Sequence, residues 1–81
     1  SLLKENLYYP RRARKRGITG EVVVSFKINI QGSVREVKTI SSSSEILSRA
    51  ALKTIKDLSG KFPKPSEDLT LQLPISYSLA Q

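Results

Sequence analysis

The 81-residue chain contains no cysteine, no histidine, no methionine and no tryptophan. Without cysteine it can form neither a disulfide framework nor a thiolate metal site. Without histidine, paired carboxylates in an apolar run or a phosphate-cradling loop, it lacks the side chains that most catalytic sites use. The sequence therefore predicts a protein that is not an enzyme and that has no metal site and no cofactor.

Long apolar runs are also absent, since none approaches the roughly 20 residues that a membrane-spanning helix needs. A chain that lacks methionine and opens on Ser1, Leu2 and Leu3 is typical of a piece cut from a longer protein, so we expect any signal peptide or membrane anchor upstream. Acidic residues are scarce. Fourteen lysines and arginines against seven aspartates and glutamates give a net charge of +7, which predicts an anionic partner.

A β-hairpin is predicted between residues 22 and 40. Apolar side chains alternate with polar ones over residues 22–28, which is the period of a half-buried strand. Gln31 and Gly32 then form a turn signal, and a second β-rich segment covers residues 34–40.

The second strand of this hairpin has an irregular apolar pattern. Val34, Val37 and Ile40 are three residues apart and cannot share one face of a flat strand, so we expect a bulge near Arg35 and Glu36.

Two turns fit the hairpin. A two-residue loop at Gln31 and Gly32 leaves Ile30 in the strand, whereas a type I turn with Gly32 in a bulge places Ile30 in the loop.

A long amphipathic helix is predicted over residues 45–59. Ser42 and Glu45 have the spacing of a capping box, and Gly60 ends the helix. Positions that recur at three and four residues form one mostly apolar stripe: Leu47, Ala50, Ala51, Thr54, Ile55 and Leu58.

A short helix is predicted over residues 10–16, and five of its positions are cationic: Arg11, Arg12, Arg14, Lys15 and Arg16. Two interpretations fit this basic segment. It is either a solvated helix whose arginine stems cover the sheet, or an anion-binding surface.

The last predicted strand covers residues 69–79, with Pro74 in its middle. Because proline has no N–H to donate to a ladder, this strand should lie at an edge of the sheet. Alternate residues of a strand direct their backbone N–H and C=O groups to opposite sides. Pro74 therefore costs no hydrogen bond between strands only if the even-numbered residues direct these groups away from the neighbouring strand. The outward class would then include Thr70, Gln72, Ser76 and Ser78, while Leu71, Leu73, Ile75 and Tyr77 would pair inward.

The predicted order is short helix, strand, strand, long helix and strand, which indicates a two-layer α+β domain with a thin core. Several pieces of this order resemble the C-terminal domain of the TonB family, from residue 7 to residue 79. They are Tyr9-Pro10, Ala13, residues 17–28, Gln31-Gly32-Ser33-Val34, the serines before the long helix, Leu47 with Ala50-Ala51-Leu52, Phe62-Pro63-Lys64-Pro65 and Leu73-Pro74-Ile75-Ser76-Tyr77.

The resemblance implies a three-stranded antiparallel sheet with two helices on one face, built on a β-β-α-β core with its first strand central. It divides the chain into an extended receptor-contact segment at residues 1–9 and the domain itself at residues 10–81. The analogous C-terminal domain of TolA has the same architecture, but the Tyr-Pro and Phe-Pro-x-Pro motifs favour TonB.

The resemblance also implies a function in the periplasm. Such a domain ends a protein anchored in the inner membrane, whose missing N-terminal region contacts motor proteins there. It transmits work derived from the proton-motive force to outer-membrane transporters of siderophores, metal chelates or cobalamin. Its direct partners are the transporter's Ton box, which adds a β-strand, and the transporter's plug. Exposed strand edges would also allow the isolated domain to form a homodimer.

The residues expected to bind these partners follow from the motifs. A Gln-Pro pair that is common before the family's Tyr-Pro corresponds here to Asn6 and Leu7, so the side chains available for plug contact differ. The expected partner-binding residues are Asn6, Leu7, Tyr8, Tyr9, Pro10, Arg11, Arg12, Arg14, Thr70, Gln72, Ser76, Tyr77 and Ser78.

The main alternative is a nucleic-acid-binding module that uses the basic segment at residues 11–16. Such a module should also present stacking aromatic side chains on the exposed sheet face. The positions expected there, Val23, Ser25, Lys27 and Asn29, offer none. We therefore expect no nucleic-acid partner.

Overall fold

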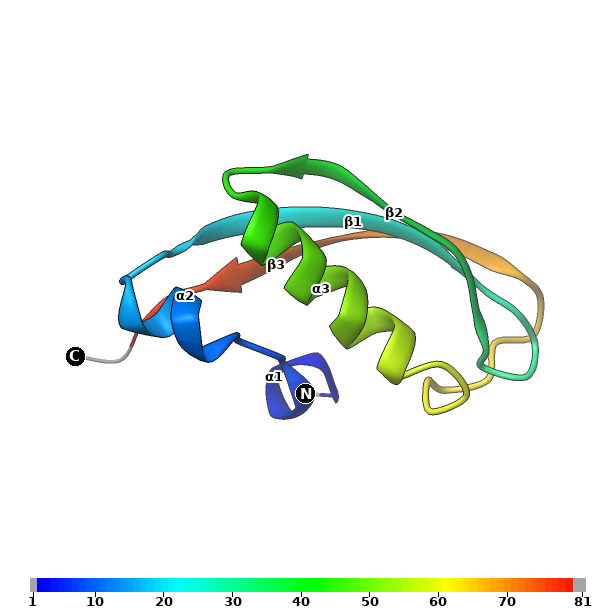
Figure 1. Ribbon diagram of the computed structural model, residues 1–81. Helices are drawn as coiled ribbons and strands as arrows, with labels where there is room; N and C mark the ends of the chain where they lie inside the picture. Colours follow the sequence, from blue (N-terminus) through cyan, green and yellow to red (C-terminus); the bar gives the residue numbers. More distant parts are fainter. Residues whose placement is uncertain (1, 80–81) are drawn as a thin grey trace.

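The computed structural model describes residues 2–79, which form one twisted sheet with its helices on one face (Figure 1). The antiparallel strands are β1 (Gly20–Ile28), β2 (Val34–Ser42) and β3 (Leu69–Tyr77), in the order β2-β1-β3. The predicted three-stranded α+β architecture, with the first strand central and the last strand at an edge, is confirmed.

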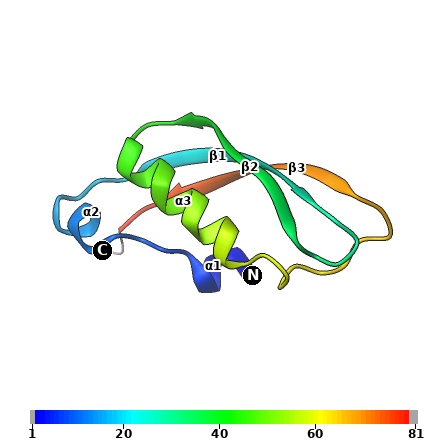
Figure 2. The same cartoon turned by 45° about the vertical axis from the view of Figure 1, so that its right-hand side comes forward.

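Three helices cover the same face of the sheet: α1 (Leu2–Asn6), α2 (Arg11–Lys15) and α3 (Glu45–Asp57). In Figure 2, α3 crosses the sheet and α2 lies near the C-terminal end of β3, while α1 lies on the same side of the sheet as α3. The buried core between the layers is almost entirely apolar and comprises Ala13, Val22, Val24, Phe26, Ile28, Leu47, Ala50, Ala51, Ile55, Leu58, Ile75 and Tyr77.

Helix α3 presents the apolar stripe that the sequence predicts, since all six stripe residues are buried. Its start differs from the prediction. Ser44 is the N-cap residue, and the Ser42 hydroxyl bonds to the backbone of Ser44 instead of forming a capping box with Glu45. The prediction was wrong because β2 continues to Ser42, which leaves that residue in the strand. The helix ends at Asp57, two residues before the predicted end.

The hairpin contains the predicted bulge. Ser25 pairs with Lys38 and Lys27 pairs with Arg35, so two residues of β2 lie opposite one residue of β1. One of them, Glu36, has a positive φ of 52°. A second irregularity at Ile40, which was not predicted, lets β2 follow the twist of the sheet.

The turn of the hairpin matches the alternative with Ile30 in the loop. The N–H of Gly32 donates to the carbonyl of Asn29 at 2.9 Å, and Gly32 has a φ of 79°. A side chain at Gly32 would also collide with the neighbouring loop, because its Cβ would lie 2.5 Å from the carbonyl oxygen of Phe62. Glycine is therefore required here by both conformation and space.

The N-terminal segment differs from the extended segment expected at residues 1–9, because Leu2–Asn6 form helix α1. A five-residue helix is unstable alone, so its stability must come from packing. Leu3 and Leu7, four residues apart, share one side of this segment and pack against the core. Only the residues after α1 are extended.

Candidate functional site

The outer edge of β3 carries backbone groups that pair with no other strand among residues 2–79. The N–H of Asn29, directly after β1, donates to the carbonyl of Ser33 at 3.0 Å, so Asn29 directs its backbone groups to the β2 side. The other odd-numbered residues of β1 direct their N–H and C=O groups to the same side. Because alternate residues point to opposite sides, Val22 and Val24 direct their groups toward β3, where their partners are Ile75 and Leu73. The even-numbered residues of β3 therefore direct their backbone groups outward.

We call the outward groups of Thr70, Gln72, Pro74 and Ser76 the outer edge. All four residues are exposed. Pro74 lies opposite Val23 and loses no ladder bond, because the N–H that it lacks would have pointed to solvent. It does leave a gap in the row of donors, which discourages uncontrolled pairing with other strands.

An apolar hollow of about 320 Å³ lies beside the middle of the outer edge. Helix α1 forms one wall and β3 forms the other. Its lining residues are Leu3, Lys4, Leu7, Pro74, Ile75 and Ser76. A strand added to β3 would place alternate side chains against this hollow.

A basic groove of about 980 Å³ continues from the end of β3 to α2. Its lining residues are Tyr8, Tyr9, Arg11, Arg14, Lys15, Ser78 and Leu79. The three cations occupy positions i, i+3 and i+4 of α2 and so lie on one side of that short helix.

Arg12 lies away from this groove, on the side of α2 that faces α3. It lines two smaller hollows, together with Ile46 and Arg49 of α3. The predicted basic segment therefore contributes to two surfaces, and Arg11 lines both of them. Arg11 and Arg14 share the groove with Ser78, whereas Arg12 does not.

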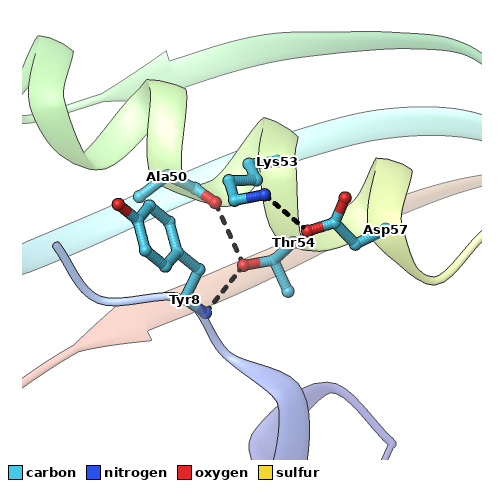
Figure 3. Close-up of polar contacts among 5 residues, drawn as sticks. All are labelled: Tyr8, Ala50, Lys53, Thr54 and Asp57. Atoms are coloured by element: carbon cyan, nitrogen blue, oxygen red, sulfur yellow. Dashed lines mark hydrogen bonds and ion pairs between the residues drawn. The ribbon is translucent and has the colours of Figure 1, made fainter.

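The segment before α2 is attached to α3 by the hydrogen bonds drawn in Figure 3. The N–H of Tyr8 donates to Oγ1 of Thr54 at 2.9 Å, and the Thr54 hydroxyl donates to the carbonyl of Ala50 at 3.0 Å. Tyr8 as a residue is 43% exposed, and the ammonium of Lys53 lies 5.5 Å from the centroid of its ring. Asp57 accepts a hydrogen bond from Lys53, which raises the pKa of that lysine.

Tyr77 has a structural position, which corrects its inclusion among the partner-binding residues. Its side chain is only 2% exposed, and its backbone belongs to the class that faces β1. Burial raises the pKa of its phenol. Among the described residues, no group lies in hydrogen-bonding position to its hydroxyl.

The other predicted residues lie near the two ends of this surface. Asn6 is exposed on α1 and donates to the carbonyl of Leu2 at 2.8 Å, while Pro10 precedes α2 at its N-cap. Sequence reasoning missed Leu3 and Leu79. The spacing of Leu3 and Leu7 could have revealed the first, whereas nothing local signals that Leu79 lies beside α2.

The open face of the sheet, away from the helices, carries no aromatic side chain on the three described strands. Val23 and Ser25 lie there with their cross-strand partners Pro74 and Gln72. The stacking platform expected of a sheet that binds single-stranded nucleic acid is missing. This observation argues against the nucleic-acid alternative.

Residues 2–79 contain no helix that is long and apolar enough to cross a membrane. The same residues contain no group of three or more histidine, cysteine, aspartate or glutamate side chains that could hold a metal ion.

Comparison with known families gives a match over residues 5–79 to the family described as Gram-negative bacterial TonB protein C-terminal. Among curated proteins, the chain is 50% identical over 74 residues to the TonB protein of Helicobacter pylori strain J99, covering 90% of this chain and 26% of that protein. It is 35% identical over 81 residues to the TonB protein of Campylobacter coli, covering 99% of this chain and 35% of that protein. The chain thus spans about a quarter to a third of these relatives.

Among solved structures, the chain resembles two solution structures of the Helicobacter pylori TonB C-terminal domain. The first has a TM-score of 0.86 at 46% identity, covering 99% of this chain and 76% of the other. The second has a TM-score of 0.84 at the same identity, covering 99% and 88% respectively.

Proposed function

The chain belongs to the family of TonB C-terminal domains, and on that premise we propose that it is the receptor-binding end of a periplasmic energy transducer. The rest of that protein would anchor it in the inner membrane and contact the motor proteins there. The domain would transmit work derived from the proton-motive force to outer-membrane transporters of siderophores, metal chelates or cobalamin.

The observation that supports this proposal most strongly is the outer edge of β3. Its outward N–H and C=O groups can pair with an extended peptide, which is recognition by β-augmentation. We propose that the Ton box of a transporter adds as a fourth strand here. Main-chain bonds at Thr70, Gln72 and Ser76 would supply affinity and would tolerate changes in their side chains.

The segment before α2 supports a second contact within the same function. Leu7 lines the hollow beside the outer edge and Tyr8 lines the basic groove, and the exposed Asn6 directly precedes them, so these three residues could touch the transporter's plug. Arg11, Arg12 and Arg14 add positive charge to the same end of the molecule, which would speed association with an acidic surface and make it sensitive to salt.

The test is a titration of the isotope-labelled domain with a synthetic Ton box peptide. We expect amide shifts concentrated at Thr70, Gln72 and Ser76. Ser76→Pro should reduce affinity at least about tenfold, because it removes an outward donor without removing a ladder bond to β1. Ser76→Ala is the matched control and should bind nearly as well as the wild type. Equal binding by both variants, or shifts confined to other surfaces, would contradict the proposal.

A further inference from the structure

Two adjoining hollows lie between α2 and α3, and together we call them the helix cleft. Their volumes are about 430 and 300 Å³, and Arg12, Ile46 and Arg49 line both of them. The cleft gathers the positive charges of two helices: Arg11, Arg12, Arg16, Arg49 and Lys53. Glu45 supplies the one carboxylate in its lining among residues 2–79.

The domain balances little of this positive charge by itself. Arg49 donates to the carboxylate of Glu45 at 2.7 Å, and Lys53 donates to Asp57 at 2.9 Å. Both pairs are exposed to solvent, so each holds its cation only weakly. The other cations of the cleft form no ion pair with a carboxylate among residues 2–79: Arg11, Arg12 and Arg16. Arg12 and Arg16 are four residues apart and repel one another, so an anion in the cleft would relieve this repulsion.

The side chains of the helix cleft suit phosphate groups at a membrane surface. Four of its five cations are arginines, whose guanidinium fork can donate two parallel hydrogen bonds to phosphate oxygens. The exposed Tyr8 and the half-buried Ile18 and Ile46 lie among these cations. Basic side chains interleaved with apolar and tyrosine side chains are typical of surfaces that lie at the boundary between lipid and water.

The helix cleft differs from the outer edge of β3 in what it offers a partner. It lies between two helices, so it presents side chains and no row of free strand N–H and C=O groups for an extended peptide. None of the described residues that line it belongs to β3. The cleft and the outer edge can therefore be occupied at the same time.

We infer that the helix cleft docks the domain on an anionic phospholipid surface. Arg12, Arg16 and Arg49 bind the phosphate groups of the lipids, and Arg49 exchanges its carboxylate partner Glu45 for phosphate. Tyr8 lies at the level of the headgroups. Attraction between exposed cations and a charged leaflet falls off within about 8–10 Å, so docking is reversible and weakens with salt. The domain stays near the membrane while the outer edge of β3 remains open.

Vesicle binding by the 81-residue chain tests this inference. Vesicles of phosphatidylcholine with about one quarter phosphatidylglycerol supply the anionic surface, and pure phosphatidylcholine vesicles are the neutral control. Sedimentation of the vesicles measures the bound fraction at low and at physiological ionic strength. We expect binding to the anionic vesicles only, with lower affinity at the higher ionic strength.

Two double variants locate the binding surface. Arg12→Gln with Arg16→Gln should weaken vesicle binding roughly tenfold, because both cations line the cleft. Arg35→Gln with Lys38→Gln is the matched control and should weaken it about twofold or less. It removes the same charge from exposed residues of β2, whose partners Lys27 and Ser25 place them on the open face of the sheet.

Glu45 provides a test in the opposite direction. Glu45→Gln releases Arg49 and removes the carboxylate from the cleft, so it should strengthen vesicle binding roughly threefold. Glu67→Gln makes the same change in net charge at an exposed position in the loop before β3, and it should leave the affinity almost unchanged.

Three results would overturn the inference. The first is a failure to bind anionic vesicles. The second is an equal loss of affinity in the two double variants, which would show that net charge alone attracts the domain. The third is tighter binding to polyglutamate than to vesicles with the same concentration of negative charge, which would identify an acidic protein as the occupant. None of these results bears on pairing at β3, which the Ton box titration tests separately.

Discussion

The ring of Tyr9 packs edge-on against the ring of Tyr77, with centroids 5.0 Å apart and an angle of 83° between their planes. The Tyr9 hydroxyl also donates to the carbonyl of Ile18, in the loop between α2 and β1. One side chain thus joins the segment before α2, the loop after it and the end of β3. These three segments form or border the basic groove, so Tyr9 should fix its shape.

Tyr9→Phe should lower the free energy of unfolding by about 1 kcal/mol, because the ring contact remains while the hydrogen bond to Ile18 is lost. Tyr77→Phe is the matched control. It removes a buried hydroxyl that has no hydrogen-bond partner among the described residues, so its stability should stay within about 1 kcal/mol of wild type or rise. Urea unfolding measures both, and a larger loss in Tyr77→Phe would contradict this assignment.

The pKa of Tyr77 predicts a change at alkaline pH. Burial raises this pKa above its ordinary value of 10.0, so the unfolded chain loses the proton before the folded domain does. The contribution of the Tyr77 phenol to the free energy of unfolding should be fully present below about pH 10. It should be lost as the pH rises through the pKa of the folded domain.

Unfolding curves between pH 8 and pH 11 provide the measurement, compared with those of Tyr77→Phe. The stability difference between the two proteins should be constant below about pH 9 and should shift in favour of the variant above pH 10. A constant difference over the whole range would show that the phenol titrates as it does in the unfolded chain.

Thr54→Val should cost about 1–3 kcal/mol, because the N–H of Tyr8 loses its acceptor while the shape of the side chain is kept. Thr54→Ser retains the hydroxyl and should cost about 1 kcal/mol for the missing methyl group. Amide exchange at Tyr8 distinguishes the causes. It should accelerate strongly in the valine variant and little in the serine variant, and equal exchange in both would contradict the role of this bond.

Much of the fold could be predicted because its signals are local. The apolar stripe of α3 repeats over more than three turns. Pro74 indicates an edge strand because proline has no N–H to donate to a neighbouring strand. Helix α1 could not be predicted from its five residues, since its stability depends on Leu3 packing against the core. The N-cap was misplaced because several adjacent serines offer the same cap chemistry, and the end of β2 decides among them.

The site was predicted only in part, for a similar reason. Gln72 and Ser76 each lie two residues from Pro74, so the sequence alone identifies them as residues whose backbone groups point outward. The division of α2 into a groove side and an α3 side depends on how that helix packs. The bond from Tyr8 to Thr54 spans 46 positions in the sequence, and no pattern of residues indicates it.

Gly32→Ala should destabilise the domain by more than Gly60→Ala, although both glycines have positive φ values of 79° and 86°. Both substitutions carry a conformational cost of about 1–2 kcal/mol. Only at Gly32 would the new Cβ meet backbone, 2.5 Å from the carbonyl oxygen of Phe62, whereas Gly60 faces open space. Thermal unfolding ranks the two variants, and equal melting temperatures would contradict the close approach of this loop.

Amide hydrogen exchange along β3, in the free domain and with a bound Ton box peptide, tests the proposed binding edge most directly. In the free monomer, Leu71, Leu73 and Ile75 should be protected by β1, while Gln72 and Ser76 should exchange quickly. The peptide should slow exchange at Gln72 and Ser76 and leave the others unchanged. If Gln72 and Ser76 are protected in the free monomer while Leu73 exchanges quickly, or if the peptide protects neither, this edge does not bind the partner strand.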